Sequence, residues 1–330
     1  MRPLRVLLLA GGPSAEREIS IASGRAVRDA LRLAGHTVSI CDPLDETIAH
    51  IHAEWFDVAF IALHGRYGED GTVQEQLDAV GLPYTGSGPL ASALAFDKSR
   101  AKIRFRKHQV PTPAWSPIRQ GDSPEIWQAA ARQLGLPVVA KPDRQGSSIG
   151  VGFALSIEDV PTVGAAALRF DVTGLLEQAI SGEEWTVPLL DEECLPPIRI
   201  GTARAFFDYE AKYLCNETAY EFPADVPASQ VDRILITAQQ AVQALGCTGL
   251  SRVDLRVDPS GQPWVLEVNT IPGLTDHSLS PKSAAHAGID FPEFCTLLCE
   301  RALQTAGRPA SGPHIRPALT PQRHVIPIRK

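Results

Sequence analysis

Two neighbouring segments show the clearest alternation of apolar and polar positions: residues 250–257 and residues 263–269. Successive side chains of a strand point to opposite faces, so these segments and the short turn between them predict a β-hairpin. Arg252 and Asp254 then share one face of the first strand. Glu267 and Asn269 likewise share one face of the second strand.

The pairing of the two strands decides whether these four polar residues meet. If Val257 pairs with Gln262, even-numbered positions of the first strand lie opposite odd-numbered positions of the second. The polar side chains then converge, and four apolar side chains form the core side: Val253, Leu255, Leu266 and Val268. Two carboxylates and an amide oxygen suit Mg²⁺, which completes its shell with substrate phosphates. An ordinary surface hairpin with salt bridges is the alternative. Residues 269–273 favour the metal and phosphate site, because they turn the backbone away from the second strand and leave space for a ligand.

Strand and helix patterns alternate over the first part of the chain. Apolar strands are predicted at residues 6–10, 36–41 and 58–63, with helices at 19–34 and 73–80. Thr72 and Glu75 predict a capping box for the second helix, which Gly81 ends. Alternation of this kind predicts a doubly wound parallel α/β domain over residues 1–97. Its ligand loops should follow the strand ends, at residues 11–16 and 64–70.

Two further units are predicted downstream, and both mix strands with helices. Residues 98–180 hold a first helix to about residue 107, strands at 137–141, 151–155 and 174–180, and a helix at 157–168. Residues 181–306 hold strands at 185–190 and 197–200, a helix at 230–245, the hairpin, and helices at 282–287 and 292–306. Residues 307–330 are rich in proline and basic residues and predict a disordered tail.

Composition narrows the class of protein. The 330 residues are 44% hydrophobic and 21% charged, which is typical of a soluble protein with more than one domain core. A net charge of −7 disfavours a nucleic-acid partner, although local lysines can still hold a small anion. No apolar run is long enough for a membrane span, and residues 4–10 are better explained as a buried strand than as a signal peptide. Six cysteines without metal spacing indicate reduced thiols and a cytoplasmic protein.

A glycine- and serine-rich loop is the first candidate for phosphate binding. The chain has neither a Walker motif nor a G-x-G-x-x-G sequence before a helix. Residues 146–150 could instead offer backbone N–H groups to phosphate oxygens, although such a loop is weak support alone. Lys141 strengthens the hypothesis, because it ends an apolar strand and would need an anionic partner if buried. Lys98 and Lys212 carry less information, since most lysines are solvated.

Three other polar residues have two interpretations each. The strand that ends at Glu177 could pair its edge with an adenine ring, or could simply end in a solvated carboxylate. His64 follows a buried strand, where binding residues gather, but a hydrogen-bonded core histidine is equally compatible. Glu16 lies at the first ligand loop and could also be a first-turn acid favoured by the helix dipole.

Taken in order, these motifs resemble the D-alanine–D-alanine ligases of the ATP-grasp superfamily over about residues 4–306. The matching segments are residues 11–20, 62–71, 82–88, 97–98, 141–150, 208–213, 252–254, 267–273 and 277–279. Single motifs are ambiguous, but their joint order is specific. The first two segments distinguish this family from biotin-dependent carboxylases, which share only the ATP-grasp body.

The resemblance implies a two-lobed ATP-grasp fold behind the N-terminal domain, with ATP between the lobes. It implies phosphate contacts for Lys98, Lys141 and Lys212, adenine contacts for Glu177, Gln178, Ala179 and Ile180, and a ribose contact for Glu184. It also implies that two Mg²⁺ ions, which Mn²⁺ could replace, bind Asp254, Glu267 and Asn269. Many relatives have a bulkier residue than Ala179, and we expect a modest effect on ATP affinity.

The implied reaction has two steps and two D-alanines. The carboxylate of the first attacks the γ-phosphate of ATP, and the amine of the second then displaces phosphate from the D-alanyl phosphate. By resemblance, Glu16 holds the first ammonium with His64 nearby, Ser278 and Leu279 receive the second carboxylate, and Arg252 and the Gly273 N–H form the oxyanion site. The resemblance also implies that Ser147 and Tyr213 link Glu16 to a loop that closes over the site and excludes water from the acyl phosphate.

Two alternatives to the ligase are kept. One is an ATP-grasp enzyme that joins another acid and amine, such as a depsipeptide or D-alanyl-D-serine former; Tyr213 disfavours the depsipeptide, since relatives that use D-lactate have histidine in this loop. The other is an inactive nucleotide-binding protein, which would lack a metal ligand or a lysine, and none is missing. The resemblance also implies a homodimer, small-molecule substrates, and neither nucleic acid nor membrane as a partner.

Overall fold

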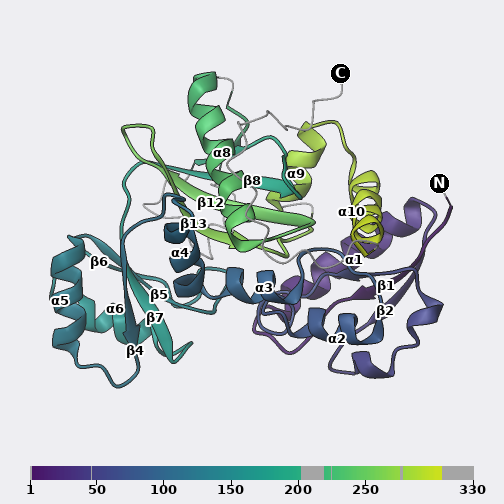
Figure 1. Cartoon of the computed structure of the whole chain (residues 1–330), viewed down its shortest axis with the longest axis horizontal. Helices are drawn as coiled ribbons and strands as arrows, with labels where there is room; N and C mark the ends of the chain where they lie inside the picture. Colours follow the sequence, from purple (N-terminus) through teal and green to yellow (C-terminus); the bar gives the residue numbers. More distant parts are fainter. Residues whose placement is uncertain (1, 46, 202–218, 224, 276–277, 307–330) are drawn as a thin grey trace.

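The computed structural model describes residues 2–45, 47–201, 219–223, 225–275 and 278–306 (Figure 1). The helices are α1 (Arg17–Leu33), α2 (Thr72–Val80), α3 (Pro89–Phe96), α4 (Lys98–Lys107), α5 (Pro124–Leu134), α6 (Val160–Ala167), α8 (Ala228–Leu245), α9 (Leu279–His286), α10 (Phe291–Ala306) and the short η1 (Ile48–His50) and η2 (Ala53–Trp55). The strands are β1 (Arg5–Leu9), β2 (Thr37–Cys41), β3 (Val58–Ile61), β4 (Trp115–Arg119), β5 (Val138–Pro142), β6 (Gly152–Ala154), β7 (Thr173–Gln178), β8 (Glu183–Leu190), β9 (Glu193–Cys194), β10 (Ile198–Gly201), β11 (Ala219–Glu221), β12 (Leu250–Val257) and β13 (Pro263–Asn269).

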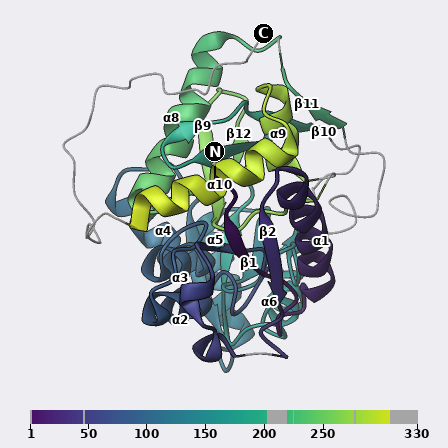
Figure 2. The ribbon, with the colours of Figure 1, turned by 90° about the vertical axis from the view of Figure 1, so that its right-hand side faces the viewer.

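The N-terminal sheet is parallel, in the order β2-β1-β3, and helices cover both faces. Val6 and Leu8 of β1 pack with α1 and α10 on one face. Leu7 and Leu9 pack with Leu77 of α2 on the other. Figure 2 shows α10, from the far end of the described chain, beside α1. The predicted doubly wound arrangement is confirmed, because alternate strand residues feed two separate cores.

The predicted capping box of α2 is wrong. Thr72 is the first residue of the helix, and Gly71 before it has a left-handed backbone with φ of 95°. The side chain of Asp70 performs the capping, because its Oδ1 accepts a hydrogen bond from the Thr72 N–H at 3.0 Å. Gly81 ends the helix in a left-handed conformation, as predicted.

The other two sheets form two lobes, as the resemblance implies. The sheet β4-β7-β5-β6 is antiparallel, and α5 and α6 pack on it through Trp127 and Val160 (Figure 1). The sheet β11-β10-β8-β12-β13 has β9 paired to β8, and α8 covers it together with α4. Phe105 of α4 is fully buried in that second core, so α4 joins the two halves. Among the described elements, those without a counterpart in the sequence predictions are α3, β4, α5, β9, β11, η1 and η2.

The register of the β12–β13 hairpin differs from the prediction. Val257 pairs with Pro263, and a β-bulge near Leu266 shifts the register so that Asp254 pairs with Glu267. The polar residues therefore do converge, through the bulge and not through the predicted turn. Leu266 is only half-buried, and the fully buried core residue of β13 is Val265.

Two further observations concern the described helices and thiols. None of the described helices is long and apolar enough to cross a membrane. Of the cysteines in the described part of the chain, all five are buried free thiols, and Cys295 and Cys299 lie on α10 as predicted. Cys215 and residues 307–330, for which a tail was predicted, lie outside the described residues.

Candidate active site

A cavity of about 80 Å³ lies where the three parts of the chain meet. The following predicted site residues line it: Glu16, His64, Ser147, Arg252, Glu267, Asn269, Gly273, Ser278 and Leu279. Residues from loops more than a hundred positions apart are therefore brought to one place. A larger cavity of about 580 Å³ lies elsewhere and contains none of the predicted site residues.

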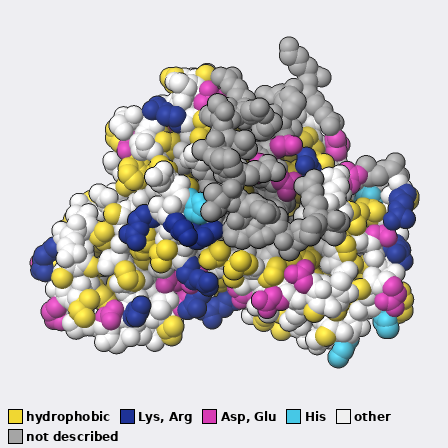
Figure 3. All heavy atoms as spheres, in the orientation of Figure 1, with side chains coloured by type: hydrophobic (Ala, Val, Ile, Leu, Met, Phe, Trp, Pro, Cys, Tyr) yellow, Lys and Arg dark blue, Asp and Glu magenta, His cyan; other side chains and the backbone are white. Residues whose placement is uncertain are grey.

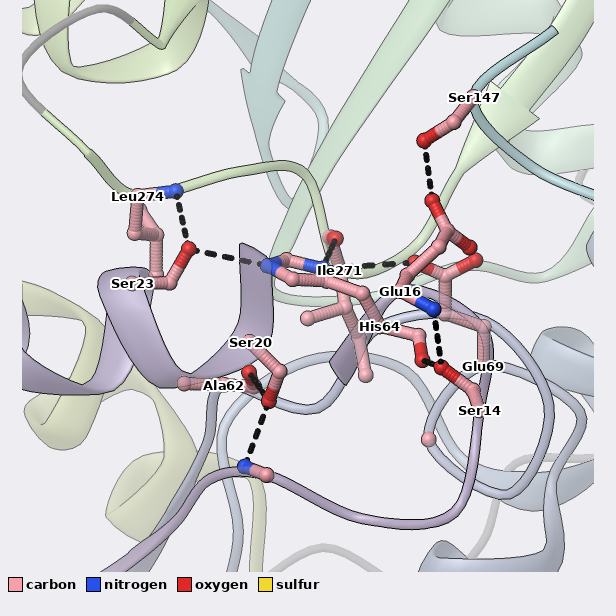
Figure 4. Close-up of polar contacts among 12 residues, drawn as sticks. Ser14, Glu16, Ser20, Ser23, Ala62, His64, Glu69, Ser147, Ile271 and Leu274 are labelled. Carbon is pink, nitrogen blue, oxygen red and sulfur yellow. Dashed lines mark hydrogen bonds and ion pairs between the residues drawn. The ribbon is translucent and has the colours of Figure 1, made fainter. Parts of the chain in front are cut away.

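Glu16 is held at the start of α1 and faces the central lobe (Figure 4). Its carboxylate accepts a hydrogen bond from the hydroxyl of Ser147. Added Cβ atoms at Gly65 and Gly146 would lie 2.7 and 2.8 Å from Glu16 Oε2. The two glycines therefore let the backbone approach this carboxylate without displacing it. Ser147 itself has a left-handed φ of 51°, so the loop carries strain at this contact.

His64 is buried, and both of its ring nitrogens have partners (Figure 4). Nδ1 lies 3.1 Å from the Ile271 carbonyl, which can only accept, so Nδ1 carries the proton. Nε2 then accepts a hydrogen bond from Ser23 Oγ at 3.0 Å. These two hydrogen bonds are those expected of a hydrogen-bonded core histidine. The ring also lines the cavity, so His64 belongs to the site as well.

Glu69 was not singled out from the sequence, yet it lines the same cavity. Its Oε1 lies 3.7 Å from His64 Nδ1. Burial, together with the negative charge of Glu16, raises the pKa of Glu69 above its ordinary value, although the neighbouring His64 ring acts in the opposite direction. Glu69 lies in the loop after β3, between Tyr67 and Asp70. That place in a predicted ligand loop was the sequence signal that could have identified it.

Ser278 and Leu279 form the N-terminal end of α9. Ser278 is the N-cap residue, and its hydroxyl contacts the Thr275 N–H at 3.0 Å and the Thr275 hydroxyl at 2.9 Å. A Cβ at Gly273 would lie 2.8 Å from Ser278 Oγ, so glycine allows the two segments to pack closely. Free N–H groups at a helix start favour a carboxylate ligand.

Asp254 is the most constrained of the predicted metal ligands. Arg252 donates to both of its oxygens, at 2.9 and 2.8 Å. Thr186 of β8 adds a third hydrogen bond of 2.6 Å, and the Asn269 amide nitrogen a fourth of 3.1 Å. Because that nitrogen faces Asp254, the Asn269 amide oxygen lies on the other side of the amide. Thr186 was missed from the sequence, since only the strand pairing brings it there.

Glu267, the second carboxylate, is paired with a predicted phosphate ligand. Lys98 Nζ lies 3.2 Å from Glu267 Oε2 and donates to the Gln145 carbonyl at 2.8 Å. Among the described residues, no three His, Cys, Asp or Glu side chains cluster as metal ligands. Two carboxylates with one amide fit Mg²⁺ that shares its shell with phosphate oxygens.

A buried charge cluster lies apart from the cavity, in the central lobe. The carboxylate of Glu177 is paired with Lys141 on one oxygen and with Lys102 on the other, the latter at 2.6 Å. Lys102 is 1% exposed and also donates to Thr112 Oγ1 at 2.7 Å. Although burial by itself favours the neutral acid, the two lysines hold the pKa of Glu177 below its ordinary value. The cluster carries a net positive charge, which suits a neighbouring phosphate.

Lys102 was missed by the sequence analysis. The spacing of Ala101, Lys102 and Phe105 along α4 was the signal, because it places the lysine on the buried face. The predicted adenine edge follows the cluster directly. The N–H groups of Gln178 and Ala179 donate to the Ala114 and Pro137 carbonyls, so Ile180 supplies the next N–H along this edge.

Two predicted ATP ligands, Glu184 and Lys212, and the predicted loop residue Tyr213 fall outside these groupings. Glu184 is paired with Arg256 at 3.2 Å, across the β8–β12 pair and away from the small cavity. Lys212 and Tyr213 lie outside the described residues.

The lobes, the lysines and the oxygen ligands together define an enzyme of the ATP-grasp class. Comparison with known proteins is more specific. A family described as the D-ala D-ala ligase C-terminus matches residues 105–300, and one described as the D-ala D-ala ligase N-terminus matches residues 41–87. The chain belongs to the D-alanine–D-alanine ligase family.

Similar proteins cover nearly the whole chain. A D-alanine–D-alanine ligase of Stutzerimonas stutzeri is 43% identical over 91% of this chain and 95% of its own. One of Alkalilimnicola ehrlichii is 45% identical over 92% and 97%. The ligase of Bacillus anthracis, solved in complex with ATP, superposes with a TM-score of 0.81 and 32% identity over 92% and 98% of the two chains.

Proposed function

We propose that this chain joins two molecules of D-alanine to D-alanyl-D-alanine and converts ATP to ADP and phosphate, as part of peptidoglycan precursor synthesis. Membership of the ligase family supports this activity. The observation that carries the proposal is the meeting of Glu16, Ser147, Arg252 and Ser278 in one cavity. That arrangement offers an anion for an ammonium group at one end and a helix N-terminus for a carboxylate at the other.

The first D-alanine is assigned to the Glu16 side of the cavity. The Glu16 carboxylate binds the substrate ammonium, and Ser147 orients that carboxylate through its hydrogen bond. The second D-alanine places its carboxylate against Ser278 and Leu279 at the start of α9. Arg252 and the Gly273 N–H stabilise the oxyanion of the tetrahedral intermediate when the second amine attacks. His64 fixes the backbone of the Ile271 segment between the two subsites.

The phosphates are assigned to the lysines, with Mg²⁺ as the metal. Lys98 and Lys141 neutralise the phosphate charge as the γ-phosphoryl group moves to the first carboxylate, and Lys212 is assigned the same role. Glu177, Gln178, Ala179 and Ile180 contact the adenine, and Glu184 the ribose. Asp254, Glu267 and Asn269 would hold two Mg²⁺ ions, or Mn²⁺ in their place, which supply charge neutralisation when bound. Tyr213 is assigned with Ser147 to the closing loop, which excludes water from the acyl phosphate.

Mass spectrometry of the products tests the reaction directly. The enzyme is incubated with ATP, Mg²⁺ and D-alanine, with L-alanine, D-serine and D-lactate as competitors. We expect D-alanyl-D-alanine alone and one ADP for each peptide bond. ADP without dipeptide would mean that the second acceptor is another molecule, and no ADP would contradict an ATP-dependent ligase.

Three further properties are proposed on the family resemblance. We propose domain limits at residues 97, 180 and 306, a homodimer, and a cytoplasmic location where ATP and reduced cysteines are maintained. Light scattering after size-exclusion chromatography tests the homodimer. Limited proteolysis followed by mass spectrometry of the fragments tests the domain limits.

A further inference from the structure

Asp171 is a buried carboxylate without a role in the reaction described so far. It lies between α6 and β7, and its side chain is 1% exposed. Arg144 donates three hydrogen bonds to it: from the backbone N–H at 3.0 Å, from Nε at 2.9 Å and from Nη2 at 2.6 Å. Two parallel guanidinium bonds plus a backbone bond fix both the position and the direction of Arg144.

Arg144 belongs to the root of the loop that carries Ser147. The flanking residues of that root are also bound: Asp143 Oδ1 accepts from the Ser99 hydroxyl at 2.7 Å, and Gln145 Nε2 donates to the Phe170 carbonyl at 3.0 Å. Beyond Gln145 the loop crosses to the N-terminal domain, where the Ser147 hydroxyl meets Glu16. Because Ser147 follows Arg144 by only three residues, a displacement of Arg144 would also displace Ser147.

The same carboxylate also faces the N-terminal domain. Arg66, in the loop after β3, lies 4.0 Å from Asp171 Oδ1. Arg66, Arg144 and Asp171 line the cavity of about 580 Å³. Figure 3 shows Lys and Arg side chains gathered beside acidic ones over this junction of the two parts. Asp171 thus forms one ion pair with the central lobe, through Arg144, and one with the N-terminal domain, through Arg66. These are the two parts that must be aligned for Ser147 to meet Glu16.

We propose that Asp171 is a positioning residue for the first D-alanine: by holding Arg144, and through it the root of the loop, it sets Ser147 against Glu16. The inference rests on the proposed function, because it assigns the first substrate's ammonium to Glu16. Lys98 donates to the Gln145 carbonyl in this root, whereas Lys141 and the predicted adenine edge lie outside the loop, so the effect should be larger for D-alanine than for ATP.

The test is Asp171→Asn, which retains the shape but removes the charge. We expect the apparent KM for the first D-alanine to rise about tenfold or more, because small misplacements of a binding group are costly. The KM for ATP should rise by clearly less than the KM for D-alanine, because Lys141 and the predicted adenine edge lie outside this loop root. Arg144→Lys keeps the positive charge of this half-exposed side chain but cannot form the two parallel hydrogen bonds to Asp171. It should therefore also raise the KM for D-alanine more than the KM for ATP.

The matched control is Asp57→Asn. Asp57 accepts from the Arg5 backbone N–H at 2.7 Å and from its guanidinium at 3.4 and 3.2 Å, but lies at the opposite end of β1 from the ligand loop. It should lower the thermal unfolding temperature without changing either KM. Adding Asp171→Asn to Ser147→Ala should produce little further rise in the D-alanine KM, because both act through one contact.

Several outcomes would overturn the inference. These are an unchanged D-alanine KM in Asp171→Asn and Arg144→Lys, equal changes in the KM values of both substrates, or full additivity with Ser147→Ala. If Asp171→Asn does not fold, Arg144→Lys decides alone. A wild-type enzyme that makes no D-alanyl-D-alanine would instead refute the proposed function, so the two failures are distinguishable.

Discussion

The Ser147 hydroxyl donates to the Glu16 carboxylate across 131 positions of sequence, from the central lobe to the N-terminal domain. A Cβ at Gly65 or Gly146 would lie within 3.0 Å of Glu16 Oε2, so a side chain at either position would displace this carboxylate. The contact brings a loop with left-handed backbone at Ser147 and Ser148 to the start of α1. It closes the cavity on the side assigned to the first substrate.

Ser147→Ala should weaken binding of the first D-alanine. A hydrogen bond to a charged group contributes about 1.5 to 3 kcal/mol, which corresponds to roughly a tenfold to hundredfold rise in KM. Initial rates over a wide range of D-alanine concentrations measure the change. Ser148→Ala is the matched control, because Ser148 has a similar φ of 57° and no assigned role. An equal effect of both substitutions would attribute the loss to backbone strain.

Glu267→Gln should abolish turnover and leave the fold intact. The substitution removes the charge that pairs with Lys98 and that we assign to the metal. We expect kcat to fall by about a hundredfold or more, as for loss of a group that stabilises developing charge. Coupled ADP release and circular dichroism measure activity and folding. Glu221→Gln, at the exposed β10–β11 edge, should retain activity, and near wild-type kinetics in Glu267→Gln would defeat the metal assignment.

Lys102→Met should lower both stability and ATP affinity. Removing one partner of a buried ion pair costs about 3 kcal/mol, because Glu177 is left with a single lysine. Lys141 would then be held more strongly by Glu177 and be less available to phosphate. Urea unfolding and the KM for ATP test both effects, with the exposed Lys107→Met on the same helix as control. A variant as stable as wild type would contradict the structural role of Lys102.

Glu69→Gln should change the pH dependence of stability. Since burial raises the pKa of Glu69, the folded protein binds its proton more tightly than the unfolded chain does. The carboxyl group therefore costs stability progressively as the pH rises from its ordinary pKa of 4.5 through its higher folded value. Relative to wild type, Glu69→Gln should gain stability over this range and then level off.

Urea unfolding at a series of pH values measures that difference. Glu75→Gln, on α2 of the same domain, is the control for the loss of one carboxylate charge. A stability difference between Glu69→Gln and wild type that stays constant with pH would contradict the raised pKa.

Much of the architecture was predictable from local patterns. The parallel strands, the hairpin, the end of α2 at Gly81 and the buried thiols of α10 all follow from periodicity and glycine placement, because burial repeats with the period of each element. The capping of α2 was not predictable in this way. Asp70 and Thr72 could each cap the helix start, and only the backbone conformation at Gly71 decides between them. The predicted hairpin register was also wrong, because a single bulge at Leu266 shifts the pairing of β13 with β12, and periodicity alone does not reveal a bulge.

By itself, the sequence determined the family, the order of the elements and most of the candidate chemistry, because motifs and periodicity are properties of neighbouring residues. The tertiary structure alone decided which of these residues meet. Thr186 beside Asp254, Lys102 beneath Glu177 and Asp171 behind Arg144 all depend on chain crossings between elements distant in sequence. Burial and pairing of charges act through space, so their energies become visible only once the strands and loops are packed.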